Sequence, residues 1–206
     1  MQVKKRDVRE KILNAAKSEF LEKGFEKSSL RQIASKANVT KGNIYNYFKS
    51  KDDLFYQLVK PALDVITRYM TQDFEEAYFG ENTENFFTLE KSQQSFRNHI
   101  DLVTEHYEIL KLLFFGSSGS SLSDFKERII RLYEASSFRF YDIVKKKNPS
   151  WQSDMSYLFI HSCATLYISF VEEIVIHRPD EKLIEKYVLE MATFVHFGIK
   201  GMMESK

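Results

Sequence analysis

The 206-residue sequence contains one cysteine, three prolines and seven glycines, and no long run of any of them. The single thiol, Cys163, excludes an intrachain disulfide, and its apolar neighbours are typical of a buried small side chain rather than a nucleophile. So few prolines and glycines leave few turns, and no run shows the alternation of a half-buried strand. The weak strand signals and the few turn residues favour an all-α fold, and the sequence shows no internal repeat.

Patterns that would carry catalysis are also missing. The sequence shows no Ser/His/Asp, Cys/His, clustered-carboxylate or cofactor pattern, so we expect no enzyme, no catalytic residues, no metal and no cofactor. Residues 114–121, FFGSSGSS, carry two glycines but lack the lysine of a phosphate-binding loop. We expect a flexible connection there.

One apolar stretch, residues 157–176, has about the length of a membrane span. It contains His161, Glu172 and Glu173, which favours a helix buried in a protein and predicts no membrane partner. The first residues, MQVKKRDVREK, hold no apolar core of the kind that secretion signals have. With the lone cysteine, this predicts a cytoplasmic location and a loose basic arm at residues 1–6.

Charge is divided unequally along the chain. The formal net charge is only +1, but residues 1–51 carry +8 and the remainder carries −7. A basic N-terminal part predicts a surface that binds phosphates, whereas a merely solvated basic face is the alternative.

Residues 28–53 predict two short helices joined by a tight turn. Ser29 and Gln32 have the spacing of a capping box, which predicts a helix start at Ser29. The apolar positions that follow fall on one narrow helical face: Leu30, Ile33, Ala34 and Ala37. A face built partly from alanine lets another helix approach closely.

A second helix is predicted over residues 41–48, after a turn at Asn38. Thr40 can cap this helix, and Ile44 and Phe48 point to one side of it. Its polar side is then left for solvent or a ligand. A third start signal, Ser50 to Asp53, follows directly. A short polar helix held against a small apolar face is the helix-turn-helix arrangement that places its second helix in the DNA major groove.

The stretch IASKANVTKGNIYNYFKSKDDLF resembles the DNA-binding signature of the TetR family of transcriptional repressors, and KILNAAKSEFLEKGFEKSSL resembles its first helix. The resemblance covers about residues 6–55; Asn38 stands where the family commonly has glycine. It implies an N-terminal helix-turn-helix domain at residues 1–50 and a helical effector-binding and dimerisation domain at residues 51–206.

The resemblance also implies which residues contact double-stranded DNA. Lys41, Gly42 and Asn43 would lie near base edges, and Lys51 near a phosphate at the start of the next helix. For Tyr47, a groove contact and a core position are equally open. The complete expected set is Ser28, Ser29, Arg31, Thr40, Lys41, Gly42, Asn43, Tyr45, Asn46, Tyr47 and Lys51.

The rest of the chain predicts further helices, about nine in all. Pro61 lies inside one of them, where we expect a kink or break. A loop is expected at residues 80–85. The expected helical ranges are 7–23, 51–78, 87–105, 107–115, 123–147, 154–177 and 180–203, beside the two of the helix-turn-helix.

The last two predicted helices are apolar on more than one face, so they need to bury residues against something besides their own body. Pairing with the same helices of a second copy, as in the resembling family, predicts a homodimer. Complete burial within one chain is the alternative.

The C-terminal part is rich in aromatic residues, which at helical spacing are ordinarily core but as a set suit an apolar cavity with a few polar groups. The resemblance implies that a small-molecule effector binds there and relieves repression. The candidate pocket residues are Phe96, His99, Phe114, Tyr133, Phe138, Tyr141, Phe159 and Tyr167. The alternative is a DNA-binding architectural or regulatory protein of the same fold with no effector.

Overall fold

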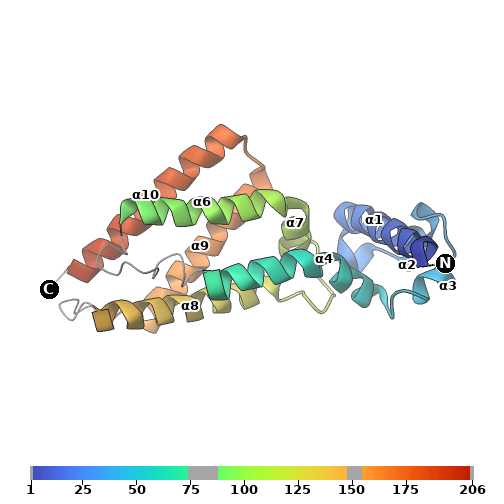
Figure 1. The fold of residues 1–206 in the computed structure, drawn as a ribbon, viewed down its shortest axis with the longest axis horizontal. Helices are drawn as coiled ribbons and strands as arrows, with labels where there is room; N and C mark the ends of the chain where they lie inside the picture. The colour runs from blue at the N-terminus through green and yellow to red at the C-terminus, as the bar shows by residue number, and fades with distance from the viewer. Residues whose placement is uncertain (1, 74–87, 148–154, 205–206) are drawn as a thin grey trace. The chain divides into compact units, whose positions relative to one another are not determined.

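The computed structural model describes residues 2–73, 88–147 and 155–204, and within these ranges every regular element is a helix (Figure 1). The predicted all-α class is therefore confirmed. The α-helices are α1 (Gln2–Lys27), α2 (Leu30–Lys36), α3 (Lys41–Tyr45), α4 (Lys51–Arg68), α6 (Leu89–Glu105), α7 (Tyr107–Phe115), α8 (Phe125–Lys147), α9 (Tyr157–His177) and α10 (Glu181–Glu204). A π-helical turn, Tyr69–Asp73, follows α4.

The chain forms two compact units. One, which we call the head, comprises Met1–Asp64 and Tyr107–Lys126, and the other, the body, comprises Val65–His106 and Glu127–Lys206. The functional boundary predicted at residue 50 stays a prediction.

The head is held together by a small apolar core. Ile12, Phe20, Ile33, Ile44 and Phe55 are completely buried, and they come from four of its helices. The ring of Phe55 meets those of Phe20 and Phe25 edge-on at 5.1 and 5.3 Å between centroids. Burying each large apolar side chain contributes about 1.5–3 kcal/mol, so this cluster fixes α1 and α4 against the two short helices.

The body is built around contacts of α6 with α9 and α10. Val188, Ala192 and His196 line the buried face of α10 at helical spacing. The buried His196 Nδ1 lies 3.0 Å from the hydroxyl of Ser92 on α6, and burial lowers the pKa of His196. A neutral imidazole is thus part of the body's packing.

Several local expectations differ from the structure. The expected loose arm is helical from Gln2, the helix predicted over residues 41–48 ends at Tyr45, and α4 continues past Pro61 without a break. Losing one backbone donor at Pro61 is tolerated because the remaining helical hydrogen bonds persist. The expected loop at 80–85 lies outside the described residues.

The connection at 114–121 is also more ordered than the predicted flexible one. Ser117 and Ser120 are buried, and their hydroxyls donate to the carbonyls of Leu113 and Ser117. The backbone amide of Ser121 donates to Asp52 at 2.7 Å, at the start of α4. Serine-rich composition here satisfies buried backbone groups instead of keeping a linker solvated.

α9 is the one helix in the described ranges that is long and apolar enough to cross a membrane by length and composition. A third of its most apolar window is buried within the protein. Ile160, Ala164 and Ile168, among others, pack inside the body, which is typical of a partly buried core helix.

Candidate nucleic-acid interface

Each short helix of the head begins at the cap that the sequence predicts. The hydroxyl of Ser29 accepts from the amide of Gln32 at 3.2 Å, and that of Thr40 accepts from the amide of Asn43 at 3.2 Å. The side chain of Gln32 accepts from the Ser29 hydroxyl at 3.4 Å instead of returning to a backbone amide. These caps set where α2 and α3 start.

The turn between α2 and α3 depends on one left-handed residue. Asn38 has φ of 53°, as predicted, and the amide of Val39 donates to Ala34 at 2.9 Å. Asparagine tolerates this conformation better than other non-glycine residues. The turn therefore closes without glycine.

α3 separates its apolar and polar sides cleanly. Ile44 is fully buried and Phe48, just beyond the helix, is 1% exposed. The residues on the other side are exposed: Lys41, Gly42, Tyr45 and Asn46. The exposed fraction of Tyr45 is 51%. A polar, positively charged strip one short helix long is thus left without a protein partner in the packing of the head.

Asn43 and Tyr47 complete this strip. Asn43 is half-buried, and its side-chain oxygen accepts from the side-chain nitrogen of Asn46 at 3.3 Å, which orients the Asn43 amide. Tyr47 is half-buried beside Phe48, with ring centroids 6.4 Å apart, so both a groove contact and a packing role remain compatible with its position. Arg31 on α2 is exposed.

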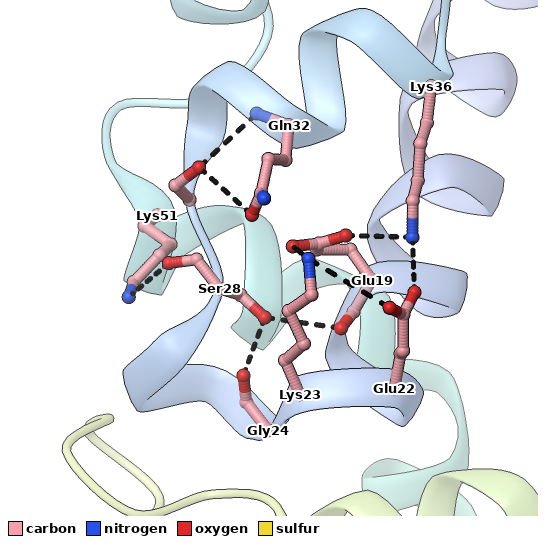
Figure 2. Close-up of polar contacts among 9 residues, drawn as sticks. Glu19, Glu22, Lys23, Gly24, Ser28, Gln32, Lys36 and Lys51 are labelled. Atoms are coloured by element: carbon pink, nitrogen blue, oxygen red, sulfur yellow. Dashed lines mark hydrogen bonds and ion pairs between the residues drawn. The ribbon is translucent and has the colours of Figure 1, made fainter.

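Ser28 and Lys51 face inward, unlike the rest of the predicted set. The Ser28 hydroxyl donates to the carbonyls of Gly24 and Glu19, at 2.5 and 3.2 Å, and Ser28 is 5% exposed. The ammonium of Lys51 contacts carbonyls at the end of α1 and in the turn that follows. Figure 2 shows the Lys51 ammonium against the carbonyl of Ser28, and the Ser28 hydroxyl directed at Gly24 and Glu19.

A buried carboxylate lies beside them. Glu19 is completely buried in α1, and its oxygens pair with Lys23 at 3.0 Å and with Lys36 of α2 at 2.7 Å (Figure 2). Lys36 also reaches Glu22 at 2.8 Å. Burial raises the pKa of Glu19, but the two ammonium groups lower it further, so its net pKa lies below the ordinary value.

Sequence reasoning missed this ion network. The spacing of four residues between Glu19 and Lys23 indicates an ion pair along α1. Nothing in the spacing places Lys36, from another helix, on the same carboxylate.

The predicted pocket residues divide between the two units. Phe114 lies in the head, where its ring meets Phe125 at 5.2 Å. In the body, Tyr167 stacks on Tyr133 at 4.4 Å and meets Phe96 edge-on at 5.7 Å. The side chain of His99 lies outside what the structure describes.

The remaining predicted pocket residues lie in the body. Phe138 stacks on Tyr157 at 6.0 Å, and Phe159 is half-buried. Burial raises the pKa of the Tyr141 phenol well above its usual range, with nearby Cys163 contributing. Burial also raises the pKa of the Cys163 thiol, which keeps it protonated.

Two hollows of the body are lined by described residues. One, bounded by α6, α9 and α10 and including Phe96, Tyr167 and Tyr187, has a volume of about 10 Å³. That is about the space of one water. The other, an open groove between α6 and α10, has a volume of about 610 Å³ and a polar rim with Arg97, Asp101 and Glu185.

Known proteins resemble the chain in both sequence and structure. Residues 12–58 match the family model described as bacterial regulatory proteins, tetR family. A Haemophilus influenzae protein named as an uncharacterized HTH-type transcriptional regulator is 31% identical over 127 residues, which are 62% of this chain and 62% of that one. The match thus spans less than two thirds of that relative's length.

Solved structures share the fold along nearly the whole chain. A Clostridium perfringens protein has a TM-score of 0.64 at 24% identity and covers 91% of this chain and 97% of its own. The Bacillus subtilis regulator FadR, solved in complex with stearoyl-CoA, has a TM-score of 0.57 at 21% identity and covers 88% and 96%.

Proposed function

The chain is a TetR-family transcriptional regulator, and from that premise we propose that it is a repressor that binds a pseudo-palindromic operator as a homodimer and is released by a small molecule bound in its C-terminal domain. The family is not one of enzymes, in agreement with the sequence, and its members are often repressors. DNA binding through the helix-turn-helix is its common activity. Such a regulator acts in the cytoplasm.

One observation carries the DNA-binding proposal: the exposed strip of α3. Lys41, Gly42 and Asn43 occupy the first turn of α3, where amide groups and side chains approach base edges when a recognition helix enters the major groove. Asn43 reads a base and Lys41 addresses a guanine or a phosphate. Arg31, Ser29 and Thr40 border the strip and supply backbone contacts, as do the exposed parts of Tyr45, Asn46 and Tyr47.

The outer face of α10 supports the proposed homodimer. Leu183, Phe194 and Phe197 are 55%, 64% and 56% exposed, and they lie opposite the face that packs on α6. On α9, Leu158 and Ile176 are 70% and 53% exposed. Exposed large apolar side chains on α9 and α10 are stabilised when a second copy covers them.

The aromatic side chains that meet in the body, among them Phe96, Tyr133 and Tyr167, suit the apolar part of an effector. FadR of Bacillus subtilis was solved with stearoyl-CoA, so a long-chain acyl-CoA is the first compound to test on this chain. An effector changes DNA affinity only if it binds one arrangement of the body more tightly than another. Its binding then shifts the protein toward that arrangement.

A second candidate is a DNA-binding regulator without an effector. The observation that favours it is the hollow of about 10 Å³ beside Phe96 and Tyr167, which leaves no room for a ligand within the described residues that line it.

The test first selects the DNA sequence that the protein binds, and then adds small molecules to the protein–DNA complex. Selection from a random duplex pool should enrich a two-fold symmetric site with half-sites about one helical turn apart. A matched duplex with one half-site scrambled is the control. Enrichment of no symmetric sequence would contradict the proposal.

Effector response is then measured on that operator. Stearoyl-CoA, free coenzyme A and stearate are added to the complex, with anisotropy reporting release. Release by any small molecule supports the repressor with an effector. If the operator stays fully occupied by the protein at saturating concentrations of a broad panel of compounds, the second candidate is favoured.

A further inference from the structure

The ammonium group of the half-exposed Lys51 is hydrogen-bonded to backbone carbonyls of the head. Its Nζ donates to the carbonyl of Phe25 at 2.7 Å and to that of Ser28 at 3.0 Å, and it lies 3.4 Å from the carbonyl of Glu26. A lysine ammonium has three donors, and these three carbonyls account for all of them. Figure 2 shows the side chain directed at the segment before α2.

The same group lies over an anchored aromatic ring. Lys51 Nζ is 4.2 Å from the ring centroid of Phe25, and Phe25 is itself packed against Phe20 and Phe55. A cation over an aromatic face is stabilised electrostatically, by about 0.5–2 kcal/mol depending on its solvation. The ring thus holds the ammonium at the carbonyls.

The carbonyls belong to a segment in which the helical hydrogen bonding ends. α1 ends at Lys27, so the carbonyls of Phe25 to Ser28 lack the regular helical partners four residues further on, and that of Phe25 accepts only from the amide of Ser28, at 3.3 Å, within the backbone. A positive charge at the C-terminal end of a helix satisfies such groups and interacts favourably with the helix dipole. Ser29, the N-cap of α2, follows at once.

Ser28 reinforces the same segment from the other side. Its hydroxyl donates back to α1, at Gly24 and Glu19, while its carbonyl accepts from Lys51. Ser28 and Lys51 therefore fix the point at which the chain enters the helix-turn-helix.

We propose that Lys51 is a positioning residue for operator binding: its ammonium holds the turn between α1 and α2, and with it the angle at which α2 and α3 meet DNA, instead of neutralising a phosphate. This inference rests on the proposed DNA-binding function. It assigns Ser28 the same role.

The experiment compares the salt dependence of operator affinity in the full-length protein and in Lys51→Met. Methionine keeps the apolar stem and removes the charge. We expect operator affinity to fall by about tenfold, the equivalent of one charge-assisted hydrogen bond, while affinity for random duplex stays the same. The slope of log affinity against log salt should not change.

Lys49→Met is the matched control, because Lys49 is exposed in the same head and its loss reports the general effect of one charge. A phosphate contact at Lys51 would instead reduce the magnitude of the salt slope by about 0.9 per subunit, or about 2 for a dimer. That reduction, beyond any seen with Lys49→Met, would overturn the inference. So would a folded Lys51→Met that binds the operator as tightly as the wild type.

Lys51→Arg gives a second readout that does not depend on charge loss. Guanidinium groups bind phosphate at least as well as ammonium groups do, but their planar fork does not fit three convergent carbonyls. We expect Lys51→Arg to lose operator affinity as well, and full affinity would contradict a positioning role. Circular dichroism at the assay temperature establishes that each variant is folded.

Failure of the proposed function has a different signature. If the wild type binds no operator, the function fails before any variant is compared. If the wild type binds and the variants change only the salt slope, the function stands and the positioning role fails.

Discussion

At the residue scale, the buried ion network of Glu19 is the least expected feature of the head. A fully buried carboxylate is tolerated because Lys23 and Lys36 compensate its charge. Removing water from a charge costs several kcal/mol, and only well-placed partners offset that cost. The network joins α1 to α2, so it also contributes to the orientation of the helix-turn-helix.

Glu19→Gln should destabilise the protein at neutral pH by about 1–3 kcal/mol, because the lysines lose their charged partner. The folded-state pKa of Glu19 is lowered from its ordinary value of 4.5, so its stabilisation is present above that value and is lost as pH falls through the folded-state pKa. Urea unfolding at pH 7 and in steps below pH 4.5 measures this. Wild type and Glu19→Gln should converge in stability at the acid end.

The control for this prediction is Glu10→Gln, which changes an exposed carboxylate of the same helix. It should change stability by less than about 0.5 kcal/mol. A Glu19→Gln protein as stable as the wild type at pH 7 would show that the network contributes nothing.

Asn43 carries the sharpest prediction about sequence reading. Because the Asn46 amide orients its side chain, Asn43→Ala should lose about 1–3 kcal/mol of discrimination at one base position of the operator, with little change on random DNA. Competition titrations with operators varied at each position measure it. Equal losses on operator and random duplex would exclude base reading by Asn43.

At the element scale, the junction after α1 depends on Gly24. Its φ of 73° lies in the left-handed region, and it stands where α1 changes direction before α2. The next amide, that of Phe25, donates to the carbonyl of Gly116 at 2.7 Å. The left-handed backbone of Gly24 is thus followed directly by a hydrogen bond to a residue distant in the sequence.

Gly24→Ala should destabilise the protein by about 1–2 kcal/mol, because a Cβ is unfavourable at this φ. Space is not the reason, since an added Cβ would meet Gly116 no closer than 3.6 Å. Denaturant midpoints measure the change. Ser18→Ala, at an exposed position of α1, should stay within about 0.5 kcal/mol of the wild type and serves as the control.

The caps show how well single elements follow from sequence. Ser29, Thr40 and Ser50 each accept the amide expected of them, and Asp53 accepts from the Lys49 amide at 2.7 Å. A cap residue bonds an amide only three or four positions away, so the start of a helix depends little on tertiary packing. The recognition helix ends three residues early, since Phe48 turns into the core.

At the scale of the whole molecule, the proposed homodimer forms through the outer face of α9 and α10. Phe194→Glu should weaken the homodimer and lower operator affinity by at least about tenfold, because a charge cannot be buried unpaired in an apolar interface. Sedimentation at several concentrations, followed by operator titration, measures both effects.

Lys182→Glu introduces the same side chain at an exposed position of α10 and is the matched control. It should leave the association unchanged. A wild type that remains monomeric at high concentration would contradict the dimer itself, independently of either variant.

The sequence by itself determined the helical class, the helix starts and the helix-turn-helix, because caps, periodic apolar positions and a left-handed Asn38 act within a few residues. Only the tertiary structure decided that Ser28 and Lys51 face inward and that Lys36 shares a carboxylate with α1. It also decided that α7 and the segment after it group with the head. The reason is physical: a lysine can reach a phosphate or a carbonyl equally well, and only the packing of distant segments selects between them.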